Sequence, residues 1–402
     1  MTKHKFLAAI SNTTIQYFNY ALFGLSAISL SKNLMPGVDA ESKLFNFFAL
    51  IMLSILARPF GSFIFGILGD MIGRKVSIIF SGIISSFATI LVSQIPNFED
   101  IGVIASICLI LSRMLFLGSF SGEIDGVRIY ISESVSAKRQ FLSNGIVSFF
   151  TQSGTLLASL LIFAWSDTNQ YWRMCFLFGG IIGLLATILR FYLTESSEFI
   201  ELKKENNIFN LTMSQIIFGQ FRLFVKLSII FGIIGIFYQF NIIFLPSYLA
   251  TTKVIDINSY IPIFIICYGG FSPVWGYLCD KYGPKRIIIF AAFLIINSYI
   301  LMLYLLEHCL YIYLPYLIVI IAIFSSAIAS PAQMIIKRNI NVAIRYRLFS
   351  VSHSIGSLLL STPTGFICFS IAKKFPMEFI VLYPAITFVI GFMCLRTLFP
   401  KE

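Results

Sequence analysis

The chain has few of the side chains that enzymes use for chemistry. Its 402 residues include only three histidines, His4, His308 and His353, which lie far apart in the sequence. The H-E-x-x-H, G-x-S-x-G and phosphate-binding P-loop patterns do not occur. An enzyme that works inside a membrane needs histidines, cysteines or acids gathered at one depth. The sequence therefore indicates that the protein is not an enzyme.

Cysteine usage is equally uninformative for a metal or redox site. The seven cysteines are an odd number, and most of them fall within apolar stretches. Their spacing matches neither a disulfide framework nor a zinc site. We therefore expect no metal and no cofactor.

Charged residues are scarce as well. They make up 12% of the chain, whereas hydrophobic residues make up 58% and the mean hydropathy is +0.88. A soluble domain carries about 25% charged residues, so this chain is too apolar for one water-soluble core. A net charge of +11 would suggest nucleic acid in a soluble protein. Here it indicates basic loops beside a lipid bilayer, and we expect no nucleic-acid partner.

Twelve apolar stretches of about 20 residues each are long enough to cross a bilayer as helices. Their approximate bounds are 8–30, 44–68, 76–95, 101–127, 141–164, 172–193, 222–250, 259–279, 287–306, 310–336, 346–371 and 378–397. The longest polar connection lies between the sixth and seventh stretches. We predict an all-α membrane protein with six-helix bundles at 1–193 and 221–402, joined by a cytoplasmic loop at 194–220.

The basic residues predict the orientation. If both termini are cytoplasmic, 21 lysines and arginines lie on the cytoplasmic side and six on the other side. Positively charged loops favour the cytoplasmic side of a membrane. This bias indicates an inner or plasma membrane with both termini in the cytoplasm.

One polar loop occurs twice. Gly66–Gly73 and Gly276–Gly283 share the frame G-x-L-x-D-x-x-G, followed by basic residues, at a distance of 210 positions. This loop resembles the connection between helices 2 and 3 of the major facilitator superfamily, which implies two pseudo-symmetric bundles. We expect Asp70 and Asp280 to pair with basic loop residues or to cap the following helix. The expected conformational latch comprises Gly66, Asp70, Gly73, Arg74, Lys75, Gly276, Asp280, Gly283 and Arg286. The alternative is that these residues only form an ordinary turn between two helices.

Some charges fall inside the predicted spans. Charges within a membrane are expensive, so they indicate function by default. Asp125 lies three positions before Arg128, and the two can form a local ion pair. Glu123, in the same span, is either a proton-carrying carboxylate or one partner of a structural ion pair with Arg58 or Arg113.

A narrower resemblance rests on motifs spread along the chain. The matching segments are Arg58-Pro59-Phe60-Gly61, Ser121-Gly122-Glu123, Trp172-Arg173-Met174-Cys175-Phe176, Glu195-Ser196-Ser197-Glu198-Phe199, Phe244-Leu245-Pro246-Ser247-Tyr248-Leu249 and Arg345-Tyr346. They resemble the metabolite:proton symporter family, which includes proline/betaine, α-ketoglutarate, citrate and shikimate transporters. The resemblance implies a monomeric carrier in a bacterial inner membrane that moves a small metabolite together with protons.

The first span departs from this family. The family has two acids there, whereas this chain has Gln16 and Asn19. These amides cannot titrate, although they can still form hydrogen bonds to a polar solute. Glu123 is then the best remaining proton carrier, and His353 is the other titratable candidate. The alternatives are an uncoupled facilitator and a transporter-like receptor that binds without translocating.

The expected substrate site combines arginines with aromatic and amide side chains. Guanidinium groups bind carboxylates bidentately, and aromatic faces attract ammonium groups. The candidate binding residues are Tyr17, Asn19, Tyr20, Arg58, Arg113, Tyr238 and Asn241. Each aromatic residue taken singly could instead face lipid or pack in the core. The set favours a small zwitterion such as proline or betaine, or an organic acid, bound near the bilayer midplane and moved by alternating access.

Overall fold

The computed structural model describes residues 3–164, 171–205, 211–245, 248–249 and 261–399. Within these ranges the regular elements are helices and none is a strand. Pro246 and Ser247, which belong to one family-like segment, lie outside the described residues. Eleven segments of the described chain are long and apolar enough to cross a membrane.

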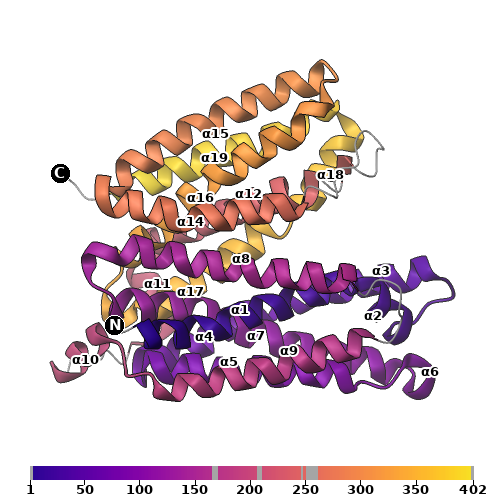
Figure 1. Ribbon diagram of the computed structural model, residues 1–402, viewed down its shortest axis with the longest axis horizontal. Coiled ribbons are helices and arrows are strands. Elements are labelled where there is room, and N and C mark those ends of the chain that lie inside the picture. The colour runs from indigo at the N-terminus through magenta and orange to yellow at the C-terminus, as the bar shows by residue number, and fades with distance from the viewer. Residues whose placement is uncertain (1–2, 165–170, 206–210, 246–247, 250–260, 400–402) are drawn as a thin grey trace. The chain divides into compact units, whose positions relative to one another are not determined.

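The helices of the first half run from α1 to α9 (Figure 1). They are α1 (Lys3–Leu25), α2 (Ala27–Leu34), α3 (Ala40–Ser54), α4 (Ala57–Met71), α5 (Arg74–Gln94), α6 (Phe98–Ile101), α7 (Val103–Ser134), α8 (Gln140–Ala164) and α9 (Tyr171–Ile188). Short 3₁₀ turns η1 (Ala137–Arg139) and η2 (Leu189–Tyr192) precede α8 and follow α9.

The helices of the second half begin with the connecting segment. They are α10 (Ser197–Lys204), α11 (Met213–Gly219), α12 (Phe221–Tyr238), α14 (Ile261–Tyr282), α15 (Pro284–Glu307), α16 (Leu314–Arg338), α17 (Arg345–Gly356), α18 (Thr364–Lys374) and α19 (Leu382–Arg396). Short 3₁₀ turns are η5 (Tyr311–Tyr313), η6 (Val342–Ile344) and η8 (Met377–Val381), and π-helical turns are η3 (Gln239–Phe244) and η7 (Ser357–Ser361).

The predicted spans differ from these helices in two ways. The first span, 8–30, coincides with α1 and α2, but α1 is not among the eleven apolar segments because Asn12, Gln16 and Asn19 lower its hydropathy. The second span is divided into α3 and α4, and the eleventh into α17, η7 and α18. Interruptions of this kind are tolerated in membrane helices because neighbouring groups satisfy the freed backbone.

The chain separates into two compact units. Unit 1 comprises Met1–Ser134, Phe150–Asn210 and Val342–Val351, and unit 2 comprises Val135–Phe149, Leu211–Asn341 and Ser352–Glu402. The start of α8 therefore belongs to unit 2 and the start of α17 to unit 1. The bundle boundaries expected from the sequence stay a prediction.

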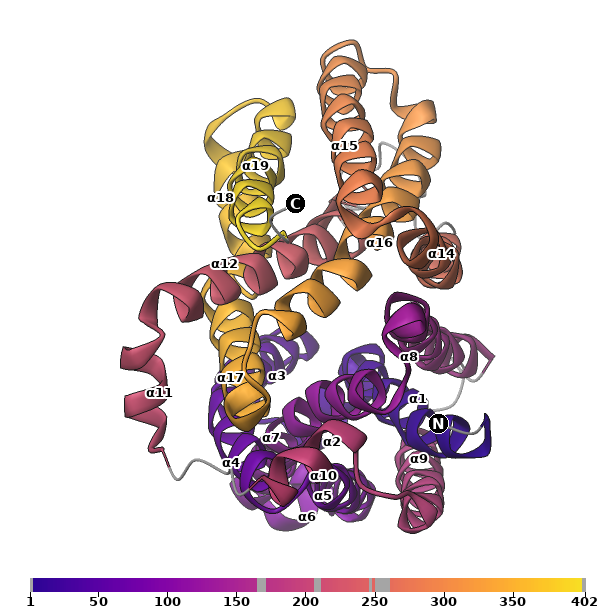
Figure 2. The same ribbon diagram turned by 90° about the vertical axis from the view of Figure 1, so that its left-hand side faces the viewer.

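Glycines let the helices of unit 1 approach closely. A Cβ atom on Gly61 of α4 would lie 1.9 Å from the carbonyl oxygen of Gly118 in α7. A Cβ atom on Gly180 of α9 would lie 2.4 Å from a side-chain carbon of Ile90 in α5. Small residues at such crossings are how membrane helices gain packing energy without a hydrophobic drive. In unit 2, α14, α15 and α16 pack against one another (Figure 2).

Candidate functional site

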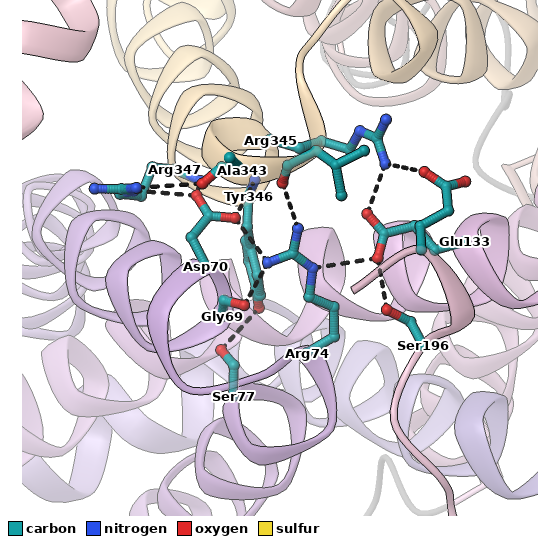
Figure 3. A network of polar contacts seen from close by, with 12 residues as sticks. Gly69, Asp70, Arg74, Ser77, Glu133, Ser196, Ala343, Arg345, Tyr346 and Arg347 are labelled. Atoms are coloured by element: carbon teal, nitrogen blue, oxygen red, sulfur yellow. Dashed lines mark hydrogen bonds and ion pairs between the residues drawn. The ribbon is translucent and has the colours of Figure 1, made fainter. Parts of the chain in front are cut away.

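Asp70 lies at the end of α4 and accepts hydrogen bonds from the first turn of α17 (Figure 3). Its Oδ1 accepts from the backbone N–H of Tyr346 at 3.1 Å, and its Oδ2 from that of Arg347 at 3.0 Å. Asp70 also pairs with Arg74 at 2.8 Å and with the Arg347 side chain at 3.1 Å. The carboxylate thus caps a helix N-terminus, where negative charge is favoured.

The sequence left two roles open for Asp70, which were pairing with basic loop residues and capping the helix that follows it, α5. The pairing with Arg74 is present, but α5 is not the helix that Asp70 caps. Instead, α5 receives its carboxylate from Glu195, whose Oε1 accepts from the backbone N–H of Lys75 at 3.1 Å. Gly73, with φ of +152°, makes the turn between α4 and α5, and a Cβ atom there would lie 2.2 Å from Glu195. The local loop pattern alone does not identify either partner.

A buried ion network continues from Arg74. Its Nε donates to Glu133 at 3.2 Å, and its Nη2 donates to the carbonyl of Val342 at 2.7 Å. Glu133 also accepts from Arg345 at 2.7 Å and from the Ser196 hydroxyl at 2.7 Å (Figure 3). Both Arg74 and Glu133 are buried. We call this group, together with Asp70 and Arg347, the Asp70 network. Such a network is favourable only when each charge is paired, as these are.

Glycines make the slot for the aromatic ring next to Asp70. Tyr346 is fully buried, and its hydroxyl donates to the carbonyl of Gly122 at 2.5 Å. A Cβ atom on Gly69 would lie 1.8 Å from the Tyr346 ring, and one on Gly126 would lie 2.0 Å from its hydroxyl. The sequence contained Arg345 and Tyr346 only as part of a family-like segment. The sequence signal for this contact was the run Arg345-Tyr346-Arg347, which places three large residues, two of them cationic, at the start of a helix.

Unit 2 repeats the geometry with fewer charges. Asp280, near the end of α14, accepts from the backbone N–H groups of Phe141 at 3.2 Å and Leu142 at 2.8 Å, in the first turn of α8. A Cβ atom on Gly276 would lie 2.5 Å from the carbonyl oxygen of Phe141. The position that corresponds to Arg74 is Pro284, which begins α15 and has no charge. The second loop therefore repeats the cap but not the arginine bridge.

In the described part of the chain, two of the expected latch residues, Lys75 and Arg286, have side chains that do not pair with Asp70 or Asp280. The Lys75 ammonium group donates to the carbonyl oxygen of Phe191 at 2.9 Å. Arg286 is exposed. Gly283 has a φ of +88°, a conformation that glycine adopts without strain. The role of all these residues as a latch stays a prediction.

Glu123 forms a bidentate ion pair with Arg190. Both guanidinium Nη atoms donate to its carboxylate oxygens at 2.6 Å, and both side chains are fully buried. The hydroxyls of Thr13 and Ser81 also donate to Glu123, each at 3.2 Å. Arg190 in turn donates to the carbonyl oxygen of Ala9 at 2.7 Å. Two parallel hydrogen bonds of this kind are the usual geometry of an arginine–carboxylate pair.

The partner of Glu123 differs from the one expected. The structural alternative named Arg58 or Arg113 as its partner. Arg190 reaches Glu123 from η2, which follows α9. Helical periodicity gives the angle of a residue on its own helix but does not say which helix faces it.

Arg113 is surrounded by aromatic rings. Its guanidinium carbon lies 4.0 Å from the centroid of Phe23, 5.2 Å from that of Tyr20 and 5.3 Å from that of Phe116. The side chain is 6% exposed, and its Nε has no hydrogen-bond acceptor. Within the described ranges no carboxylate pairs with it. Phe120 stacks on Tyr20 with centroids 4.9 Å apart. We call these residues the Arg113 cage.

The other candidate binding residues of unit 1 are Tyr17, Arg58 and Asn19. Tyr17 meets Phe120 edge to face at 5.2 Å. Arg58 is partly buried, and its Nε has no acceptor. Asn19 is buried and donates to the carbonyl oxygen of Gly179 at 3.3 Å, so its amide also joins α1 to α9.

The remaining candidates belong to unit 2. Asn241 donates to the Tyr299 hydroxyl at 2.8 Å, and Tyr238 meets the ring of Tyr268 at 5.6 Å. His353 stacks on Phe231 with centroids 4.7 Å apart. Their expected roles in substrate binding and proton coupling stay predictions, as does the pairing of Asp125 with Arg128.

Residues 5–208, about half of the chain, match the sequence profile of the sugar (and other) transporter family. The chain belongs to this family. A glycine betaine/proline/ectoine/pipecolic acid transporter, OusA of Dickeya dadantii, is 27% identical over 385 residues, which cover 89% of this chain and 75% of that one. A proline/betaine transporter of Salmonella typhimurium is 25% identical over 386 residues with the same coverage. For relatives in Staphylococcus aureus that are 29% identical over 297 residues, the match spans 62% of their length.

Solved structures show the same fold. The proton:xylose symporter XylE of the major facilitator superfamily has a TM-score of 0.82 at 14% identity, with 99% of this chain and 95% of that one covered. FucP in the outward conformation has a TM-score of 0.71 at 12% identity, with 98% and 99% covered. The protein therefore has the all-α major facilitator fold that the sequence predicted. It is an integral membrane protein and a secondary transporter of small solutes, not an enzyme.

Proposed function

We propose that this transporter carries a small zwitterion, of the proline or betaine type, and that Arg113 binds the carboxylate. The observation that carries this proposal is a buried guanidinium without a carboxylate among the described residues of the chain. A buried charge that lacks a counter-ion is costly, so an anionic ligand would complete the site. A guanidinium binds a carboxylate with two parallel hydrogen bonds.

The aromatic side chains beside Arg113 suit the other end of a zwitterion. Tyr20 lies next to the guanidinium, Phe120 stacks on Tyr20, and Tyr17 meets Phe120 edge to face. Such faces attract a quaternary or secondary ammonium group. Glycine betaine and proline each combine a carboxylate with a cationic nitrogen, and both appear in the name of the Dickeya relative. An organic acid would use Arg113 but leave the aromatic faces without a cation.

Proton symport through Glu123 is the second part of the proposal. A carboxylate that accepts a proton in the cycle must give up one acceptor oxygen of its bidentate pair. Arg190 would then move with each turnover. Gln16 supports this assignment because it stands where the resembling family has an acid and cannot titrate. The alternatives are an uncoupled facilitator and a receptor that binds without translocating.

Alternating access in a bacterial inner membrane, by a monomer, completes the proposal. Asp70 and Asp280 each cap a helix whose start they reach from the end of another helix. We propose that these caps are conformational latches that release when the carrier changes state. The Asp70→Asn variant is expected to transport more slowly while binding substrate with unchanged affinity. Unchanged transport rates in that variant would refute the latch.

Uptake into proteoliposomes tests the substrate assignment. The radiolabelled panel comprises proline, glycine betaine, α-ketoglutarate, citrate, shikimate and choline, each with and without an inward proton gradient. Choline shares the trimethylammonium group of betaine but lacks the carboxylate. We expect accumulation of proline or betaine, driven by the gradient, and none of choline.

Variants of Arg113 test its role. Loss of hydrogen bonds to a charged group is expected to raise KM in Arg113→Met about 10- to 150-fold. Arg113→Lys should retain part of the affinity, and the exposed Arg139→Met is the matched control. Equal uptake by parent and Arg113→Met would refute the carboxylate site. Uptake that equilibrates regardless of the gradient would favour the facilitator, and binding without uptake would favour the receptor.

A further inference from the structure

The segment that leads into α12 exposes large apolar side chains. Phe218, next to the end of α11, is 76% exposed, and Phe221, the first residue of α12, is 54% exposed. The opposite side of α11 is anchored by Ile216, which is buried. α12 starts a segment that is long and apolar enough to cross a membrane. The two rings therefore lie where the chain enters the bilayer.

The charge of this segment has one sign. No acidic residue occurs from 206 to 255. Arg222 and Lys226 fall in the first turns of α12 and, being four positions apart, share one face of the helix. They are separated by about 6 Å along its axis. Arg222 is exposed and Lys226 half-buried, and neither pairs with a carboxylate in the part of the chain that the structure describes.

α11 also turns away from the helix that follows it. Gln220 separates the two, with φ of −126° and ψ of 34°, and α12 leaves in a different direction (Figure 2). A short helix that precedes a membrane-crossing helix at an angle can lie along the bilayer surface. Aromatic side chains are enriched at that depth because their rings tolerate the boundary between headgroups and acyl chains.

We propose that α11 and the first turns of α12 form a binding site for anionic phospholipids at the bilayer surface. Phe218 and Phe221 insert beside the upper acyl chains. Arg222 binds the phosphate oxygens directly. Lys226, one turn deeper, reaches the same phosphate layer by extending its side chain towards water. Lysines and arginines next to a membrane helix each strengthen binding to anionic lipid.

A second copy of the chain is a poorer occupant for this surface. The chain carries a net charge of +11, so two copies repel one another. The neighbouring α10 supplies a contrast within the same connection. Its Ile200 is 39% exposed but lies between the acids Glu198 and Glu201, which an anionic surface repels. α10 carries both signs of charge, since Lys203 and Lys204 lie in its last turn, whereas the segment from α11 to α12 carries only positive charge.

Depth-dependent fluorescence quenching tests the apolar anchor. The full-length Phe218→Trp variant is placed in vesicles of phosphatidylcholine and phosphatidylglycerol in equal amounts, in which either lipid carries bromine on its acyl chains. Its emission is taken as the difference from the parent, which has three tryptophans. We expect bromolipids to quench residue 218. Ile200→Trp is the matched control, which aqueous iodide but not bromolipid should quench.

Charge removal tests the phosphate site. In the parent background with tryptophan at position 218, brominated phosphatidylglycerol should quench more than brominated phosphatidylcholine. That preference should weaken about fivefold for each charge lost in Arg222→Gln and Lys226→Gln. Arg222→Lys should retain it. Lys138→Gln combined with Arg139→Gln removes two exposed charges elsewhere and should also retain it.

Three results would overturn the proposal. Iodide quenching without bromolipid quenching at position 218 would place the helix in water. Equal quenching by the two brominated lipids in parent and charge variants would leave an apolar anchor with no phosphate site. Protection that rises with protein concentration in lipid-free detergent would assign the surface to a second copy. None of these outcomes depends on which solute the protein transports.

Discussion

Replacing Glu123 by glutamine tests whether the buried pair with Arg190 holds unit 1 together. The substitution preserves the shape of the side chain but removes its charge. Arg190 would keep its hydrogen bonds to the carbonyl oxygens of Ala9 and Ile78 but would lose its counter-ion. Removal of one partner from a buried ion pair costs about 3–5 kcal/mol because the other charge stays buried. We expect Glu123→Gln to lower the free energy of unfolding by about this amount.

Thermal unfolding of the purified protein in one detergent measures the effect. At about 2.1 cal/mol/K of unfolding entropy per residue, a loss of 3–5 kcal/mol in 402 residues lowers Tm by about 4–6 °C. Glu123→Gln combined with Arg190→Met removes both charges and should recover most of the loss. Glu201→Gln, at an exposed site on α10, is the control and should change Tm by less than about 1 °C.

Two outcomes would refute the reasoning. The first is a Glu123→Gln protein that melts with the parent. The second is a double variant that melts no higher than the single one, since the cost is attributed to an uncompensated arginine. Uptake by the same variants, below their melting temperatures, separates the structural role from proton coupling. Accumulation driven by a proton gradient that is unchanged in Glu123→Gln would exclude Glu123 as the proton carrier.

Three further predictions concern helix caps and packing. Asp280→Ala should lower the free energy of unfolding by about 0.5–2 kcal/mol, which is the contribution of an N-cap. Asp70→Ala should lower it by about 3–5 kcal/mol because it also leaves buried arginines without their counter-ion. Equal losses for the two variants in chemical unfolding would contradict this. Gly69→Ala should lower the free energy of unfolding by about 1–3 kcal/mol because the added methyl group clashes with the buried ring of Tyr346. Gly118→Ala is the control in the same assay. Its added Cβ meets nothing closer than 3.5 Å, so it should lose little stability. Asp39 accepts from the backbone N–H and hydroxyl of its N3 serine, and these bonds hold the pKa of its carboxyl below the usual 3.8. The cap on α3 is therefore intact above about pH 3.8 and lost as pH falls through the lower folded pKa. Hydrogen exchange in the first turn of α3 should speed up at low pH in the parent relative to Asp39→Asn, which caps without titrating.

The sequence was most informative where the pattern is local. Long apolar stretches predicted an all-α membrane protein, because crossing a bilayer requires about 20 apolar residues in a helix. The repeated loop identified Asp70 and Asp280 as a related pair, because the same eight-residue frame surrounds each. Departures within the repeat also carried information. Pro284 at the position of Arg74 predicts the missing charge of the second loop, and the structure shows that the arginine bridge is missing there.

Partners across helices were beyond the reach of the sequence. The residues that Asp70 caps lie 276 and 277 positions away, and Arg190 lies 67 positions from Glu123. Periodicity places a side chain on one face of its helix but cannot choose among the helices that could face it. The structural alternative for Glu123 named the wrong partners, Arg58 or Arg113, for this reason. Arg113 packs against aromatic rings instead of a carboxylate of the described residues.

By itself the amino-acid sequence determined the class of protein, the membrane helices and the two loops with their aspartates, because these follow from hydropathy and from short-range spacing. The tertiary structure decided which charges are neutralised and which are not. Glu123 and Asp70 form ion pairs with arginines. Arg113 contacts ring faces and pairs with no carboxylate among the described residues. That distinction depends on helix packing in three dimensions, where glycines such as Gly69 and Gly61 set how closely the backbones approach.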